Sequence, residues 1–88
     1  MTRTEQRQLA LGAARSLLRK QGRNVFTASV LDAHQVLDDF ACRYPACMVS
    51  CWYRTASEFE LALFYRDWDV WQQKQHWLLP NPLEARHR

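Results

Sequence analysis

The sequence is poor in glycine and lacks any long apolar run. Its two glycines, Gly12 and Gly22, are too few for a glycine-rich loop that cradles phosphate groups. The longest uninterrupted apolar run, residues 61–65, is far shorter than the roughly 20 residues that a membrane-spanning helix needs. The first residues are polar and charged, without the apolar segment of a secretory signal peptide. We therefore expect a soluble cytoplasmic protein that does not bind a membrane.

Catalytic motifs are also missing. The sequence has neither the GxSxG of serine hydrolases nor the HExxH of zinc proteases, and it offers no nucleophile with a base and an orienting group. Asp67 and Asp69 lack the accompanying acids and lysine of a nuclease, so we interpret them as turn and edge charges. We predict that the protein is not an enzyme, with no catalytic residues and no cofactor.

Cysteine is present, but not in a metal-binding pattern. Cys42, Cys47 and Cys51 lack the paired CxxC spacing of structural zinc sites. If residues 47–51 are extended, the two sulfurs at the ends of this segment are about 13 Å apart, too far for one ion. An odd number of cysteines without a secretion signal is typical of reduced thiols in a cytoplasm. We predict free thiols and no metal site.

The length of 88 residues predicts a single domain, 1–88, with residues 1–3 and 83–88 frayed. Its net charge of +3 is unevenly distributed. Residues 1–24 carry six basic side chains and one acidic, whereas residues 55–80 carry four acidic and two basic side chains. This polarity can steer a charged partner, or it can pair the two halves of the chain with each other.

Residues 4–21 carry the pattern of a helix. Thr2 and Glu5 stand three residues apart, as in a capping box, and Gly22 follows a basic last turn as a natural stop. Apolar residues recur between them at the 3.6-residue period of a helix. They form a stripe of Ala10, Leu11, Ala13, Ala14, Leu17 and Leu18.

Residues 29–43 predict a second helix, the most clearly amphipathic segment of the chain. Thr27 or Ser29 can cap its start, and Pro45 prevents its continuation. In the connection before it, we expect Phe26 to enter the core. The apolar arc of this helix consists of Val30, Ala33, Val36, Leu37, Phe40 and Ala41.

Residues 59–65 favour a strand over a helix. At 100° per residue, the apolar side chains from here to Trp71 scatter around the whole circumference of a helix, so no apolar stripe forms. At the two-residue period of a strand, Phe59, Leu61 and Leu63 share one face, and a mixed set of side chains occupies the other.

The flanking segments complete a predicted meander. Residues 47–54 alternate in the same way and are rich in strand formers. Residues 55–58 then form a hairpin connection, and residues 68–73 a third strand. We therefore predict an α+β fold, in which two N-terminal helices pack on a three-stranded antiparallel meander.

Two other folds stay open. Ser57 and Glu60 match a capping box, and the sequence that follows favours helix locally. These signals support an all-α fold with residues 57–78 as a third helix. A winged-helix variant would use residues 49–55 as its recognition helix and residues 59–73 as its wing, although strand formers in the first segment fit it poorly.

The best functional lead is the set of large aromatic side chains. On the strand interpretation, several of them face away from the helices beside arginines, a composition typical of protein-binding hot spots. We predict a protein-binding site formed by Trp52, Arg54, Phe64, Arg66, Trp68 and Trp71. The same face could instead stack the bases of single-stranded nucleic acid, or be buried under the C-terminal segment.

In size and in lacking catalytic groups, the chain is similar to the accessory and inhibitor proteins that phages and plasmids encode against host systems. This similarity implies a small protein whose partner is another protein. Open strand edges could also pair two copies into a homodimer.

The first predicted helix offers an alternative function. Its basic side chains recur about every four residues beside the apolar stripe, as in a helix that lies against nucleic-acid phosphates. They are Arg15, Arg19, Lys20 and Arg23. On this hypothesis the protein is a nucleic-acid-binding regulator, for example one that binds DNA. The other interpretation is that these side chains are solvated and complement the dipole at the C-terminal end of the helix.

Overall fold

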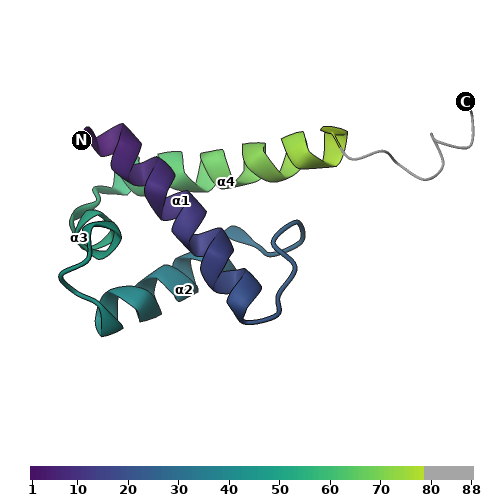
Figure 1. The fold of residues 1–88 in the computed structure, drawn as a ribbon. Helices are drawn as coiled ribbons and strands as arrows, with labels where there is room; N and C mark the ends of the chain where they lie inside the picture. The colour runs from purple at the N-terminus through teal and green to yellow at the C-terminus, as the bar shows by residue number, and fades with distance from the viewer. Residues whose placement is uncertain (79–88) are drawn as a thin grey trace, which may run out of the picture.

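All of the regular secondary structure in the described part of the chain is α-helical. The computed structural model describes residues 1–78, with side chains through residue 74. Within these residues it contains no strand and four α-helices (Figure 1), which are α1 Arg3–Lys20, α2 Val30–Arg43, α3 Met48–Thr55 and α4 Glu58–Leu78. None of these helices combines the length and the apolar composition that crossing a membrane requires. The prediction of frayed residues 83–88 lies outside the described residues.

The predicted meander, and with it the α+β fold, is wrong. Residues 58–78 form the single helix α4, close to the all-helical alternative. A capping box starts this helix: Ser57 Oγ accepts the Glu60 backbone N–H at 3.1 Å, and the Glu60 carboxylate accepts the Ser57 backbone N–H at 3.1 Å. The cap was the more reliable signal, because alternation also arises in a helix that carries apolar side chains on two faces.

The helix α3 replaces the first predicted strand. It has only eight residues and is rich in strand formers, so its own propensity is too weak to hold it. Tertiary packing supplies the missing stabilisation, because α3 packs against α1 and α2 and buries Trp52 among them. The same segment is helical in the winged-helix alternative, but residues 59–73 lie in α4 and form no wing.

The two N-terminal helices confirm their predictions. Thr2 caps α1, since its Oγ1 accepts the Glu5 backbone N–H at 3.1 Å. Beyond the end of α1, Gly22 has a φ of 74°, a conformation that side chains rarely adopt. Ser29 caps α2, since its Oγ accepts the Asp32 backbone N–H at 3.2 Å. Two of the four helices could therefore be placed from the sequence, by their caps together with their apolar stripes.

One core joins the four helices. Phe26, expected there, is exposed and stacks on Trp71 with ring centroids 5.7 Å apart, while its neighbour Val25 is buried. Adjacent side chains of this turn point in different directions, so only one of them can enter the core. The buried members are Ala10, Leu11, Ala14 and Leu18 of α1, Ala33, Val36 and Leu37 of α2, Trp52 of α3, Phe64 and Trp68 of α4, and Val25 and Ala28 of the connection.

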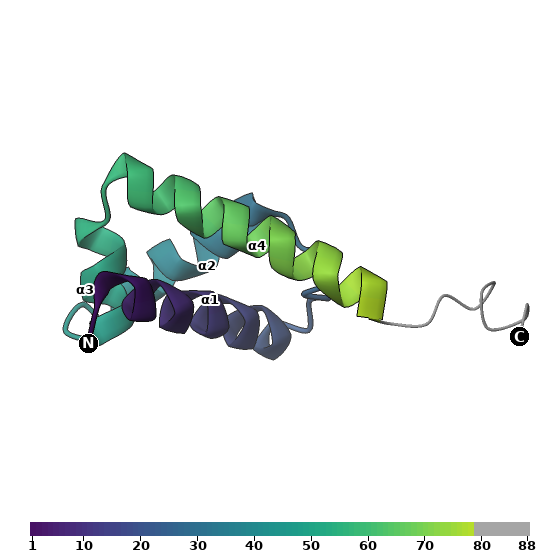
Figure 2. The ribbon, with the colours of Figure 1, turned by 90° about the horizontal axis from the view of Figure 1, so that it is seen from above.

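The last helix lies across the others and extends past them. In Figures 1 and 2 the C-terminal end of α4 runs beyond α1 and α2. Two ion pairs hold its first half to α1: Arg3 Nε lies 2.8 Å from Glu60 Oε2, and Arg7 Nε lies 2.9 Å from Asp67 Oδ2. The N-terminal half of α4 is therefore anchored to α1, and its C-terminal end projects beyond α1 and α2.

The Arg3–Glu60 pair predicts a loss of stability in acid. The Arg3 guanidinium, and then the Ser57 backbone N–H, lower the pKa of Glu60 from 4.5 to about 2. Because folding lowers this pKa, the stabilisation is present above pH 4.5 and is lost as the pH falls through about 2. We expect the free energy of unfolding to fall less over this range in Glu60→Gln than in the parent, as measured by urea titration at several pH values. Glu58→Gln is the control; an equal flattening in both variants would contradict this assignment.

Replacing Ser50 or Ser57 by alanine should change the free energy of unfolding in opposite directions. Ser50 is fully buried in α3, and its Oγ has no hydrogen-bond partner among the described residues. Ser57 Oγ caps α4. We expect Ser50→Ala to raise the free energy of unfolding by about 1 kcal/mol, because it removes an unsatisfied buried hydroxyl. Ser57→Ala should lower it by about 1 kcal/mol. Chemical denaturation of both variants tests the pair, and a loss in Ser50→Ala would show that its hydroxyl is satisfied.

Candidate functional site

Three of the predicted protein-binding residues lie in the core. Trp52, Phe64 and Trp68 are almost completely buried, and the Trp52 and Phe64 rings pack with centroids 5.9 Å apart. Their assignment to a surface depended on a sheet with two faces. In the helical fold, the largest aromatic side chains instead fill the space between the helices, as their apolar area favours.

The other three predicted residues do not gather on one surface. Trp71 is half-buried, with the Arg15 guanidinium 4.3 Å above its ring. Arg54 is exposed at the end of α3 and donates to the Pro45 carbonyl at 3.3 Å. Arg66 is exposed on α4, with Nη2 3.7 Å from its neighbour Asp67. The structure therefore does not bring the six predicted residues together.

The predicted basic ridge on α1 is partly occupied by contacts within the chain. Arg15 stacks on Trp71, and burial, followed by the nearby charge of Arg19, lowers its pKa from the ordinary value. Arg23 Nη2 lies 2.8 Å from Asp32 Oδ1, and this hydrogen bond is the main reason that the pKa of Asp32 is lowered. Arg19 and Lys20 remain exposed, with no ion pair among the described residues.

The three cysteines are not paired with one another. Cys42 and Cys51 are exposed and Cys47 is half-buried, and all three are free thiols. Among residues 1–74, whose side chains are described, no group of three or more His, Cys, Asp or Glu is placed to hold a metal ion.

The half-buried histidine His34 instead links three helices. Its ring nitrogens lie 2.9 Å from the Tyr53 hydroxyl of α3 and 3.0 Å from the Tyr65 hydroxyl of α4. Burial, and then the charge of Asp38, raise the pKa of Tyr53 to about 12, so this hydroxyl stays protonated at neutral pH. Because these contacts include no thiol or serine hydroxyl, the cluster joins helices and supplies no activated nucleophile.

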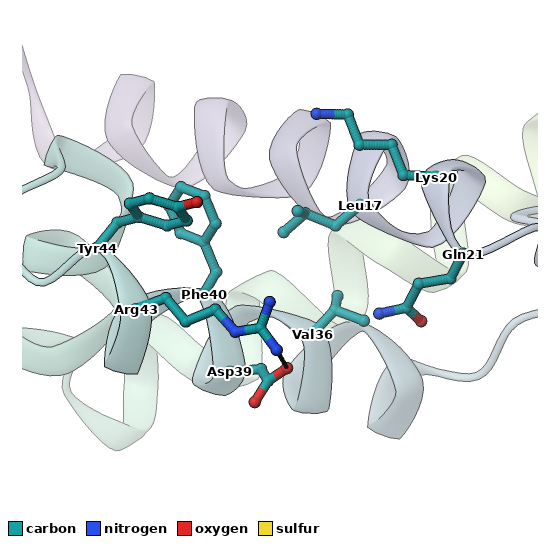
Figure 3. Close-up of a pocket in the computed structure, with 8 residues that line it drawn as sticks. All are labelled: Leu17, Lys20, Gln21, Val36, Asp39, Phe40, Arg43 and Tyr44. Carbon is teal, nitrogen blue, oxygen red and sulfur yellow. Dashed lines mark ion pairs between the residues drawn. The ribbon is translucent and has the colours of Figure 1, made fainter.

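A pocket of about 410 Å³ lies between α1 and α2. Figure 3 shows its lining, with Leu17 of α1 facing Val36 and Phe40 of α2 across the opening. Toward the end of α2, the Phe40 and Tyr44 rings pack with centroids 5.0 Å apart. Tyr44 is nevertheless 58% exposed, so one wall of the pocket is an accessible aromatic ring. The remaining lining residues are Lys20, Gln21, Asp39 and Arg43.

Helix periodicity explains why these residues meet. Val36, Phe40 and Tyr44 are four residues apart, so they stand one above another along the side of α2 and just beyond its end. Leu17 of α1 and Gln21, which directly follows α1, have the same spacing. The two rows line a groove of mixed polarity, the α1–α2 groove, whose apolar floor consists of Leu17, Val36 and Phe40.

The rim of the α1–α2 groove is polar and carries a positive charge. Its ionised side chains sum to +1, from Lys20 and Arg43 against Asp39. Arg43 Nη2 lies 3.8 Å from Asp39 Oδ2, and both side chains are about two-thirds or more exposed, so this pair is weak and easily exchanged for another partner. The arrangement suits an apolar group flanked by carboxylates.

Sequence reasoning had named the floor of the groove but assigned it to the core. Leu17 and Phe40 belong to the predicted apolar stripes, yet both are only half-buried. Tyr44 belongs to neither predicted stripe. The sequence does carry a signal of this incomplete burial. The apolar stripe of residues 4–21 is too wide to be buried completely against a single neighbouring helix.

Comparison of the chain with protein-family models, curated proteins and solved structures finds no match. Its function must therefore be argued from its own surfaces.

Proposed function

We propose that this protein is a non-enzymatic binding protein, and that its α1–α2 groove receives an acidic amphipathic helix of a partner protein. The observation that carries the proposal is the pocket of about 410 Å³, which has an apolar floor and a positively charged rim. If the chain is an inhibitor or accessory protein of a phage or plasmid, this partner is a host protein.

The shape of the groove supports a helical ligand. The floor is a row of apolar side chains between two helices, and an amphipathic helix places its own apolar side chains at matching intervals of three to four residues. A pocket of about 410 Å³ lies within the usual range of roughly 300–1,000 Å³ for ligand pockets, and it can receive a large anchor such as Leu, Phe or Trp. The exposed ring of Tyr44 provides an aromatic surface for that anchor.

The charges of the rim support an acidic ligand. Lys20 and Arg43 lie at the edge of the apolar floor, where a carboxylate beside the anchor would meet them. Arg43 can exchange its long contact with Asp39 for a shorter one to the ligand. The overall charge of +3 also favours encounter with an acidic partner.

Panning a displayed library of random peptides, about 16 residues long, against the purified protein tests this proposal. We expect enrichment of peptides that combine aromatic residues or leucine at a spacing of three or four with aspartate or glutamate. The best peptide should shift the amide resonances of Leu17, Val36 and Phe40 on titration. Enrichment of basic peptides, or shifts confined to other surfaces, would contradict the proposal.

Charge and ring substitutions sharpen the test. Tyr44→Ala should weaken binding of the selected peptide about tenfold, as expected for loss of an aromatic contact of about 1–2 kcal/mol. Arg43→Glu should weaken it by a similar factor and reduce its dependence on salt. Lys74→Glu makes the same charge change at an exposed position of α4 and should leave the affinity unchanged. Isothermal titration calorimetry measures all three.

Nucleic acid is the competing target, and the same variants separate it from a peptide. If a DNA duplex of about 20 base pairs binds with steep salt dependence, binding should depend on Arg19 and Lys20 and be insensitive to Tyr44→Ala. That result, together with no enriched acidic peptide, would overturn the proposal in favour of a DNA-binding regulator.

A further inference from the structure

The helix α4 has two apolar faces. One face packs on the other helices through Phe64 and Trp68. The second face points to solvent and carries Phe59, which is 71% exposed, and Val70, which is 52% exposed, with the half-buried Leu63 between them. At 100° per residue, these three residues and Arg66 fall within about 60° of one another, so they form a single stripe, the outer stripe of α4.

An outer stripe of this kind is unusual on a helix at the surface. A surface helix normally places polar residues opposite its buried face, whereas a helix that is apolar on both sides is usually covered on both. The far end of α4 also runs past α1 and α2 (Figures 1 and 2). Both features are explained if a second helix covers the stripe.

We infer that α4 pairs with the α4 of a second copy of this chain, antiparallel, about a two-fold axis near residue 68. The charges on the outer side of α4 select this arrangement. Arg66 and Asp69 are both exposed, Asp69 has no ion pair among the described residues, and the contact of Arg66 with Asp67 is long, at 3.7 Å. In an antiparallel pair, Arg66 of each copy lies beside Asp69 of the other. A parallel pair would place Arg66 against Arg66.

The length of α4 agrees with the same axis. Residue 68 is the midpoint of Glu58–Leu78, so charge pairing at Arg66 and Asp69 also gives complete overlap of the two helices. The overlap would be about 31 Å long at 1.5 Å per residue. Each projecting C-terminal end would then lie over the N-terminal half of the partner helix, where Phe59 is most exposed. The interface is isologous, so it closes as a dimer.

The size of this interface predicts a modest affinity. A contact confined to one helix of each copy falls at the low end of stable interfaces, about 1,200 Å² in total, and we expect a Kd in the micromolar range. The α1–α2 groove uses no residue of α4, so failure of one proposal leaves the other standing.

Sedimentation equilibrium of the full chain from about 1 µM to about 500 µM tests the dimer. We expect the parent to pass from monomer to dimer over this range, and the double variant Phe59→Ser with Val70→Ser to remain monomeric. Leu31→Ser, at an equally exposed apolar position of α2, should dimerise as the parent does. Circular dichroism confirms that each variant is folded. A parent that stays monomeric throughout, or a double variant that dimerises as tightly as the parent, would overturn the inference.

Charge exchange tests the antiparallel orientation. Arg66→Asp and Asp69→Arg should each weaken the dimer about tenfold or more, because each creates two like-charged pairs across the interface. Combining both changes in one chain restores opposite charges in an antiparallel pair, so that double variant should dimerise like the parent. In a parallel pair it would place like charges together, as the parent does. The antiparallel assignment fails if the single variants dimerise as tightly as the parent. It also fails if the combined variant dimerises no more tightly than the single variants.

Discussion

The burial of one side chain, Trp68, sets the arrangement on which the rest of the structure depends. Its ring is fully buried among the helices, and its Nε1–H donates to the Ala28 carbonyl at 3.1 Å. Gln72, one turn further along α4, donates to the same carbonyl. These contacts give the buried indole of Trp68 both apolar surroundings and a hydrogen-bond partner, so they fix the rotation of α4 about its axis and its position along the connection between α1 and α2.

Once the rotation of α4 is fixed, it determines which of its side chains are buried and which are exposed. Phe64 turns inward with Trp68, and the ion pairs of Arg3 and Arg7 hold α1 against the first half of α4. Phe59 and Val70 are then forced outward. In a chain of 88 residues there is no fifth element among the described residues to cover them, and none to fill the groove beside Phe40. Within the described residues, the small core therefore leaves two partly apolar surfaces exposed.

What could be predicted from the sequence was local. The caps at Thr2 and Ser29 and the stop at Gly22 depend only on neighbouring residues, and they located α1 and α2 correctly. The error in the second half came from ranking two-residue alternation above the equally local cap at Ser57. The groove could not have been predicted, because the depth at which Leu17 and Phe40 are buried depends on the separation of two helices, and a sequence does not state that separation.

The misleading alternation in residues 59–65 has a physical cause that bears on function. A helix with one buried face shows a clear 3.6-residue period, and that period disappears when apolar side chains are added on the opposite face. In α4 those added side chains are Phe59, Leu63 and Val70, none of which belongs to the hydrophobic core or packs against it. If folding of the isolated chain were the only constraint, polar residues would serve better at these exposed positions and would keep the protein soluble. The feature that obscured the helix in the sequence is therefore the same feature that calls for a second molecule against it.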